Sequence, residues 1–131
     1  MNFKPTEAEL EILQVLWTLG PSTVRAANIE LSRRRAELVG YTTTLKFLQI
    51  MLDKGLVVRD ASSRSHVYSA AISEAESKGK LLDRFLENTF RGSASDLVLQ
   101  ALGNHRPSDE ELSRIKALIE AMEKSDHPKK S

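Results

Sequence analysis

The sequence predicts a mainly α-helical protein with one small β-hairpin. Three observations lead to this prediction: apolar residues recur with helical spacing, three Ser/Thr-x-x-Glu patterns mark helix starts, and one short stretch has strand character around a serine-rich turn. At 131 residues, with 40% hydrophobic and 28% charged residues, the chain has the composition of a globular protein. Its length allows one compact domain or two very small ones.

Composition argues against several kinds of protein. The chain has no cysteine, which removes disulfides, thiolate metal sites and thiol nucleophiles. No apolar run approaches the roughly 20 residues of a membrane span, and MNFKPTEAEL turns charged too soon for a signal peptide. We therefore expect a cytoplasmic protein without membrane insertion. A net charge of +1 indicates no strong overall positive field, and the basic cluster Arg33 to Arg35 is equally typical of a solvated helix end.

The first helix begins at Thr6, because Thr6 and Glu9 fit the capping box, and it ends at the breaker pair Gly20-Pro21. Its apolar residues are Leu10, Ile12, Leu13, Val15, Leu16 and Trp17. A second, less regular helix follows in STVRAANIELSRRR and ends near Arg34. Its apolar residues are Val24, Ala27, Ile29 and Leu31.

A third helix is predicted in GYTTTLKFLQIMLDKG, where Gly55 ends it. Its apolar face consists of Thr44, Leu45, Leu48, Met51 and Leu52, and the opposite face of Thr42, Thr43, Lys46, Gln49, Ile50 and Asp53. Two short strands, Leu56–Arg59 and His66–Ser69, then flank the turn Ala-Ser-Ser-Arg. Three helices and a hairpin in this order predict a winged helix-turn-helix module over residues 1–72.

In such a module the third helix enters the DNA major groove with its N-terminus first. We expect Thr42 to cap this helix and Thr43 to reach a phosphate or a base edge. Lys46 and Gln49 lie further along the same face, and Arg64 in the hairpin turn is a candidate contact to the DNA backbone. Each residue alone also fits an ordinary role as a helix cap or a solvated side chain.

The second half, residues 73–124, predicts three more helices, two of them opened by Ser73 with Glu76 and Ser108 with Glu111. Fewer than 60 residues make a marginal core, so we expect a homodimer, although the helices could instead fold back onto the first module. The apolar positions include Leu81, Leu82, Phe85, Leu86, Leu97, Val98, Leu102, Leu112, Ile115, Leu118, Ile119 and Met122. Residues 125–131 are predicted to be a disordered tail.

The segments TEAELEILQVLW, GYTTTLKFLQIMLDKGLV and HVYSAAIS resemble successive signatures of the penicillinase-repressor family, the BlaI/MecI/CopY group of bacterial transcriptional regulators. The resemblance covers nearly the whole chain. It implies a transcriptional repressor that binds a palindromic operator in double-stranded DNA as a homodimer. The sequence departs from the family pattern at Ile50, where many members have arginine. An exposed isoleucine can touch a thymine methyl but cannot hold a phosphate, and Lys46 is a candidate to replace the charge.

Repressors of the β-lactam-resistance branch are inactivated by cleavage within a VLNF-like stretch, through a membrane sensor-linked protease pathway. The matching segment here is VLQA, so the resemblance places a cleavage site between Gln100 and Ala101. The different residues put that protease specificity in doubt. The copper-responsive branch fits less well, because its C-terminal cysteine motif is absent.

No pattern in the chain is typical of an enzyme. His66, His105 and His127 lack metal-ligand spacing, and no phosphate-binding glycine loop or nucleophile motif is present, so we expect neither a metal nor a cofactor. Two other hypotheses remain beside the repressor: a winged helix that binds protein rather than DNA, and a regulator that senses a small molecule.

Overall fold

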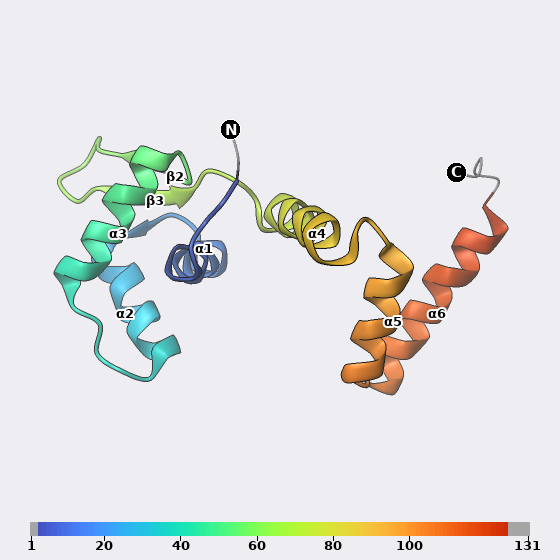
Figure 1. Ribbon diagram of the computed structural model, residues 1–131. Helices are drawn as coiled ribbons and strands as arrows, with labels where there is room; N and C mark the ends of the chain where they lie inside the picture. Colours follow the sequence, from blue (N-terminus) through green and yellow to red (C-terminus); the bar gives the residue numbers. More distant parts are fainter. Residues whose placement is uncertain (1–2, 126–131) are drawn as a thin grey trace. The chain divides into compact units, whose positions relative to one another are not determined.

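A computed structural model describes residues 3–125 and confirms the mainly helical fold with a small sheet (Figure 1). The helices are α1 (Glu7–Leu19), α2 (Val24–Arg35), α3 (Tyr41–Lys54), α4 (Glu74–Phe90), α5 (Ala94–Asn104) and α6 (Asp109–Lys124). The strands are β1 (Ser22–Thr23), β2 (Val57–Asp60) and β3 (Val67–Ala70). Within the described range, none of these helices is both long and apolar enough to cross a membrane.

The chain divides into two compact units, one ending at Arg84 and the other beginning at Phe85, so the division falls within α4. The sequence placed the change from DNA binding to dimerisation earlier, after residue 72. That functional division remains a prediction, because compactness alone does not assign a role to either unit. Of the tail predicted for residues 125–131, only Ser125 lies within the described residues, where it ends α6.

The predicted capping boxes form at the starts of α1 and α6. The Thr6 hydroxyl accepts from the Glu9 amide at 3.2 Å, and the Glu9 carboxylate accepts from the Thr6 amide at 2.9 Å. Ser108 and Glu111 form the same reciprocal pair. Ser73 accepts from the Glu76 amide at 3.1 Å, but no return bond to the Glu76 carboxylate is found in the described part of the chain, so only half of that predicted capping box forms.

The sheet has three antiparallel strands in the order β1-β3-β2, with the hairpin strands β2 and β3 joined by a loop over residues 61–66. Strands β2 and β3 each begin and end one residue later than the sequence predicts. Strand β1 is not predicted, because a strand of two residues has no detectable alternation of apolar and polar side chains. Tyr68 sits at the centre of the sheet, opposite Ser22 on one side and Arg59 on the other, and is only 1% exposed. The sheet therefore ties the start of α2 to the hairpin.

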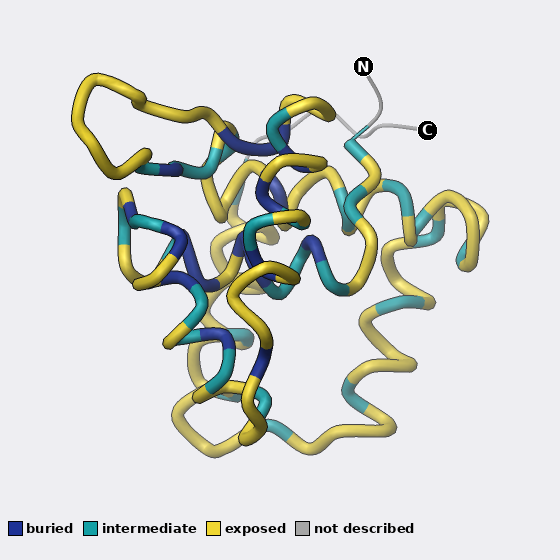
Figure 2. Tube along the Cα trace, turned by 90° about the vertical axis from the view of Figure 1, so that its left-hand side faces the viewer, coloured by how far each residue is buried: buried dark blue, intermediate teal, exposed yellow. Residues whose placement is uncertain are grey.

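The core belongs to the first unit. Among residues 3–125, every buried residue lies between Glu9 and Ser77. Figure 2 draws the buried residues as dark blue segments of the chain. The buried apolar side chains are Ile12, Leu13, Val15, Leu16, Val24, Ala27, Leu31, Val39, Leu48, Met51, Leu56, Val57 and Tyr68. Ile29 was predicted to be on the apolar face of α2 but is 61% exposed, because that helix presents only every third or fourth residue to α1 and α3.

Candidate nucleic-acid interface

The third helix, α3, has one buried and one exposed face, as its spacing predicted. Thr44, Leu48 and Met51 are buried, and Gly55 ends the helix in the left-handed conformation at φ 79°, where its amide donates to the Leu52 carbonyl. The exposed face carries the predicted DNA contacts Thr42, Thr43, Lys46, Gln49 and Ile50, of which Ile50 is 38% exposed. These side chains share one accessible surface, and their contact with DNA remains a prediction.

The three consecutive threonines have different surroundings. The N-cap residue of α3 is Gly40, which has no side chain to form a capping hydrogen bond. The predicted role of Thr42 as the cap is therefore wrong. Thr42 and Thr43 instead lie in the first helical turn and are exposed, because the chain enters the helix two residues earlier than expected. Thr44 turns inward and is completely buried. Only the first two are available to a ligand.

Asn28 of α2 positions the start of α3, a role that the sequence did not reveal. Its side-chain amide donates to the Val39 carbonyl at 2.8 Å and to the Thr44 hydroxyl at 3.0 Å. Ser32, one turn further along α2, accepts from the Val39 amide at 3.0 Å. Two polar side chains of α2 therefore satisfy the backbone of the α2–α3 turn and fix where the exposed face of α3 begins.

The basic cluster Arg33 to Arg35 is committed to internal ion pairs. Arg33 and Arg34 both bind the Glu30 carboxylate, and their hydrogen bonds lower the pKa of Glu30 to about 2. Arg35 binds Glu11 of α1 at 2.9 Å and 3.0 Å through two nitrogens. The densest run of positive charge thus holds the C-terminal end of α2 and does not form a free cationic patch.

The loop between β2 and β3 is ordered by its own polar groups. Asp60 accepts from the Ser62 amide at 2.8 Å, and hydrogen bonds from Ser62 hold the pKa of Asp60 below its ordinary value. The Ser63 hydroxyl donates to the Ser65 carbonyl at 2.8 Å. Arg64 lies between these turns, is exposed, and forms no ion pair within the described residues. Its guanidinium is thus available at the tip of the β2–β3 hairpin, which is the wing of the fold.

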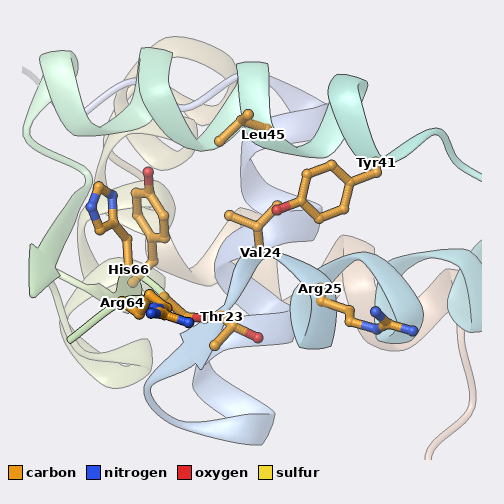
Figure 3. Close-up of a pocket in the computed structure, with 9 residues that line it drawn as sticks. Thr23, Val24, Arg25, Tyr41, Leu45, Arg64 and His66 are labelled. Atoms are coloured by element: carbon orange, nitrogen blue, oxygen red, sulfur yellow. The ribbon is translucent and has the colours of Figure 1, made fainter. Parts of the chain in front are cut away.

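A cavity of about 650 Å³ lies between the starts of α2 and α3 and the wing (Figure 3). Its lining includes Arg64, two residues that the sequence did not single out, Arg25 and Tyr41, and His66, which the sequence analysis weighed only as a metal ligand. Tyr41 points from α3 into this space, while Arg64 and His66 lie on the wing side and Arg25 on the α2 side. These residues belong to separate parts of the sequence, and only the tertiary fold brings them to one cavity.

The histidines do not form a metal centre in the described structure. Over residues 3–125, no three histidine, aspartate or glutamate side chains group closely enough to hold an ion. His66 and His105 are both exposed, and His127 lies outside the described residues.

Three packed helices, of which the third has one exposed face, followed by a two-stranded wing, define a winged-helix fold of the class that many DNA-binding regulators use. The chain belongs to the penicillinase-repressor family, whose sequence model matches residues 5–121. Over 119 residues it is 27% identical to the penicillinase repressor of Bacillus licheniformis, covering 88% of each chain. The chain is accordingly a DNA-binding transcriptional repressor, and the resemblance noted from its motifs is confirmed.

Solved structures share the fold at lower sequence identity. H. salinarum RosR is 16% identical, with a TM-score of 0.52 over 92% of this chain and 96% of that chain. The complex structure of hsRosR-S4 gives a TM-score of 0.53 at 16% identity, over 92% and 90% of the two chains. These similarities concern the fold alone.

Proposed function

We propose that this chain represses transcription as a homodimer that occupies a palindromic operator, with one α3 helix in the major groove of each half-site. The observation that supports this most is the exposed face of α3, whose start is held in place by the hydrogen bond from Asn28 to the buried Thr44. A rigid helix that presents short polar side chains at its N-terminus suits entry into the groove. The half-sites would lie about one DNA turn, or a multiple of it, apart.

Within each half-site the proposed contacts divide by chemistry. Thr42, Thr43 and Lys46 bind phosphates or base edges near the start of α3, and Gln49 reads a base edge further along. Ile50 touches a thymine methyl, and Arg64 binds the backbone from the wing. Arg33 to Arg35 are held in ion pairs and are not among the proposed contacts.

The second unit supports the proposed homodimer. Neither α5 nor α6 contains a buried residue. The exposed fractions of Phe85, Leu118, Ile119 and Met122 are 49%, 62%, 48% and 66%, while Leu97, Leu102 and Ile115 are half-buried. Leu81, the remaining proposed dimer residue, is also half-buried but belongs to the first unit. Two short helices with accessible apolar faces gain stability by covering those faces against a second copy.

Operator binding is tested with a labelled DNA fragment from the protein's own promoter and a scrambled competitor, titrated at several salt concentrations. We expect two protomers per site and competitor-resistant binding. Lys46→Ala and Arg64→Ala should each lower the salt slope by about one unit. Lys78→Ala is the matched control, because Lys78 is exposed on α4 and bound to Glu74. Equal, weak binding to both fragments would instead support a protein-binding or small-molecule-sensing role.

We also propose that repression is relieved by cleavage between Gln100 and Ala101, through a sensor-linked protease acting in the cytoplasm. Both residues are exposed, yet they lie inside α5, so the helix has to unwind locally before a protease can take up the backbone. Incubation of the purified repressor with a lysate of induced cells, followed by mass spectrometry, tests this step. A fragment that ends at Gln100 supports it, and an intact chain with loss of operator binding contradicts it.

A further inference from the structure

A smaller cavity lies within the first unit, between the end of α3 and the first half of α4. Its volume is about 210 Å³, below the roughly 300–1,000 Å³ of sites for drug-sized ligands. The cavity therefore suits a ligand with a single ring or a short branched chain. Its lining includes the apolar residues Phe3, Leu56 and Ile72 and the charged residues Lys54, Glu76 and Lys80.

The apolar part of the lining is held in place by the fold. Leu56 is 7% exposed, and its carbonyl accepts from the Ala71 amide at 2.9 Å. The carbonyl of Ile72, the next residue, accepts from the indole nitrogen of Trp17 at 2.8 Å. The segments before β2 and after β3 are thus fixed to each other and to α1, so the cavity has a preformed apolar wall.

Two charged groups of the cavity differ from their neighbours on the same helix. Glu74 and Lys78, which do not line the cavity, are one helical turn apart on α4 and form an ion pair at 3.3 Å. Glu76 and Lys80 have the same favourable spacing, yet within residues 3–125 neither forms an ion pair. In that range the Glu76 carboxylate also makes no return bond to the helix cap Ser73. A carboxylate and an ammonium group are therefore both available to a ligand in the cavity.

We propose that this cavity binds a small zwitterion with an apolar side chain, of the chemical class of a hydrophobic α-amino acid. The ammonium group of the ligand pairs with Glu76 and its carboxylate with Lys80. Its side chain contacts Phe3, Leu56 and Ile72. A simple carboxylic acid would leave Glu76 without a partner, and a simple amine would leave Lys80 without one, so the two opposite charges favour a ligand that carries both.

Lys54 connects this cavity to the proposed operator binding. Lys54 lines the cavity, and its ammonium group binds the buried Glu9 carboxylate. A ligand carboxylate in the same cavity competes with Glu9 for that ammonium group and weakens the contact between the end of α3 and the start of α1. The ligand therefore acts as an inducer that lowers the affinity for the operator. This last step rests on the proposed function, whereas the binding of the ligand does not.

Ligand binding is measured without DNA, by titrating L-phenylalanine and L-leucine into the isotope-labelled full chain and following its amide chemical shifts. Saturable shifts are expected at Gly55 and Ile72 beside the cavity and not at Leu112 of α6. Phenethylamine lacks the carboxylate of phenylalanine and hydrocinnamate lacks its ammonium group, so each should bind on the order of tenfold more weakly. The absence of saturable shifts with both amino acids, or equal affinity for phenylalanine and its two analogues, overturns the proposal.

Substitutions on α4 test the two charges separately. Glu76→Gln and Lys80→Gln should each weaken the binding of L-phenylalanine on the order of tenfold. Glu74→Gln and Lys78→Gln make the same changes two residues earlier on the helix and should bind as the wild type does. All four residues are exposed, so circular dichroism should show native melting for every variant. Equal losses in the cavity variants and the control variants would contradict a site at Glu76 and Lys80.

The inducing role is measured by fluorescence anisotropy on the promoter fragment, with and without saturating L-phenylalanine. The ligand should weaken operator binding by the wild type about fivefold or more and have a smaller effect on Lys80→Gln. Saturable amide shifts with an unchanged dissociation constant for the promoter would overturn the inducing role. If the wild type binds L-phenylalanine but no DNA specifically, the proposed function fails and the ligand site stands.

Discussion

Lys54, the last residue of α3, donates from Nζ to both carboxylate oxygens of the buried Glu9, at 2.9 Å each. Glu9 also accepts from the Thr6 amide, so one carboxylate joins the start of α1 to the end of α3. Burial alone raises the pKa of Glu9, but the hydrogen bonds from Thr6 and Lys54 outweigh burial and hold this pKa below its ordinary value of 4.5. The orientation of α3 therefore depends on an ion pair at its C-terminal end, opposite the end that is proposed to enter the DNA groove.

Replacing Lys54 should destabilise the first unit. Lys54→Met leaves the Glu9 carboxylate 97% buried with one partner fewer, and we expect a loss of roughly 1–3 kcal/mol in the free energy of unfolding, because an uncompensated buried charge is costly. Urea denaturation at pH 7 measures the loss. The control Lys78→Met breaks an exposed pair with Glu74 and should cost less than about 0.5 kcal/mol. Equal losses in the two variants would contradict the structural role of the Glu9–Lys54 pair.

Glu9 should also make stability fall in acid. Because its pKa is lower in the folded than in the unfolded chain, its contribution is complete above pH 4.5 and is lost as the pH falls through the folded-state pKa. Glu9→Gln should therefore be less stable than wild type at pH 7 but should lose less stability on acidification. Urea midpoints from pH 7 to pH 3 test this, with Glu7→Gln as a control in the same helix. A parallel decline in wild type and Glu9→Gln would argue against it.

The Asn28 side chain should be needed for the stability of the first unit. Asn28→Asp keeps the shape but replaces the amide donor with a carboxylate facing the Val39 carbonyl, and we expect a loss of about 1–3 kcal/mol. Thr44→Val removes the second acceptor while leaving the bond to Val39, so its loss should be smaller. A double-mutant cycle between Asn28→Ala and Thr44→Val measures their coupling, for which a value of zero would show that the 3.0 Å hydrogen bond is not energetically important.

Changing Ile50 should alter the balance between base and backbone contacts. Ile50→Arg places a cation on the exposed face of α3, and we expect tighter binding to any duplex, a salt slope about one unit steeper, and a smaller preference for the promoter fragment. Ile50→Ala should instead weaken binding to the promoter alone, through loss of an apolar contact. An unchanged salt slope for Ile50→Arg would show that this position does not approach a phosphate.

A charge on the exposed apolar face of α6 should dissociate the homodimer. Met122→Asp puts a carboxylate where a second copy is proposed to pack, and sedimentation equilibrium should show monomers at concentrations where the wild type is dimeric. Ser113→Asp, on an exposed position of the same helix, should remain dimeric. The melting of the first unit should be unchanged in both, since its core shares no residue with α6. A monomeric wild type would remove the basis for two-site operator binding.

The sequence by itself determined where the helices lie and which face of α3 is buried, because capping bonds and helical periodicity are local. The capping residues Thr6 and Ser108 marked the starts of their helices. The spacing of Thr44, Leu48 and Met51 predicted the buried face of α3, and Lys46 and Gln49 fell on the opposite, exposed face. The family also followed from these ordered segments. Such features depend on neighbours within a few residues of one another, so no tertiary information is required to find them.

Only the tertiary structure decided which polar groups are free. Thr44 is hydrogen-bonded to Asn28, Arg35 to Glu11 and Lys54 to Glu9, and these partners are 16, 24 and 45 positions apart in the chain. Arg25, Tyr41 and His66 line one cavity because the sheet joins the start of α2 to the wing. Pairing between distant residues has no periodic signature, since it depends on how whole elements pack, and this packing determines which charges remain available to DNA.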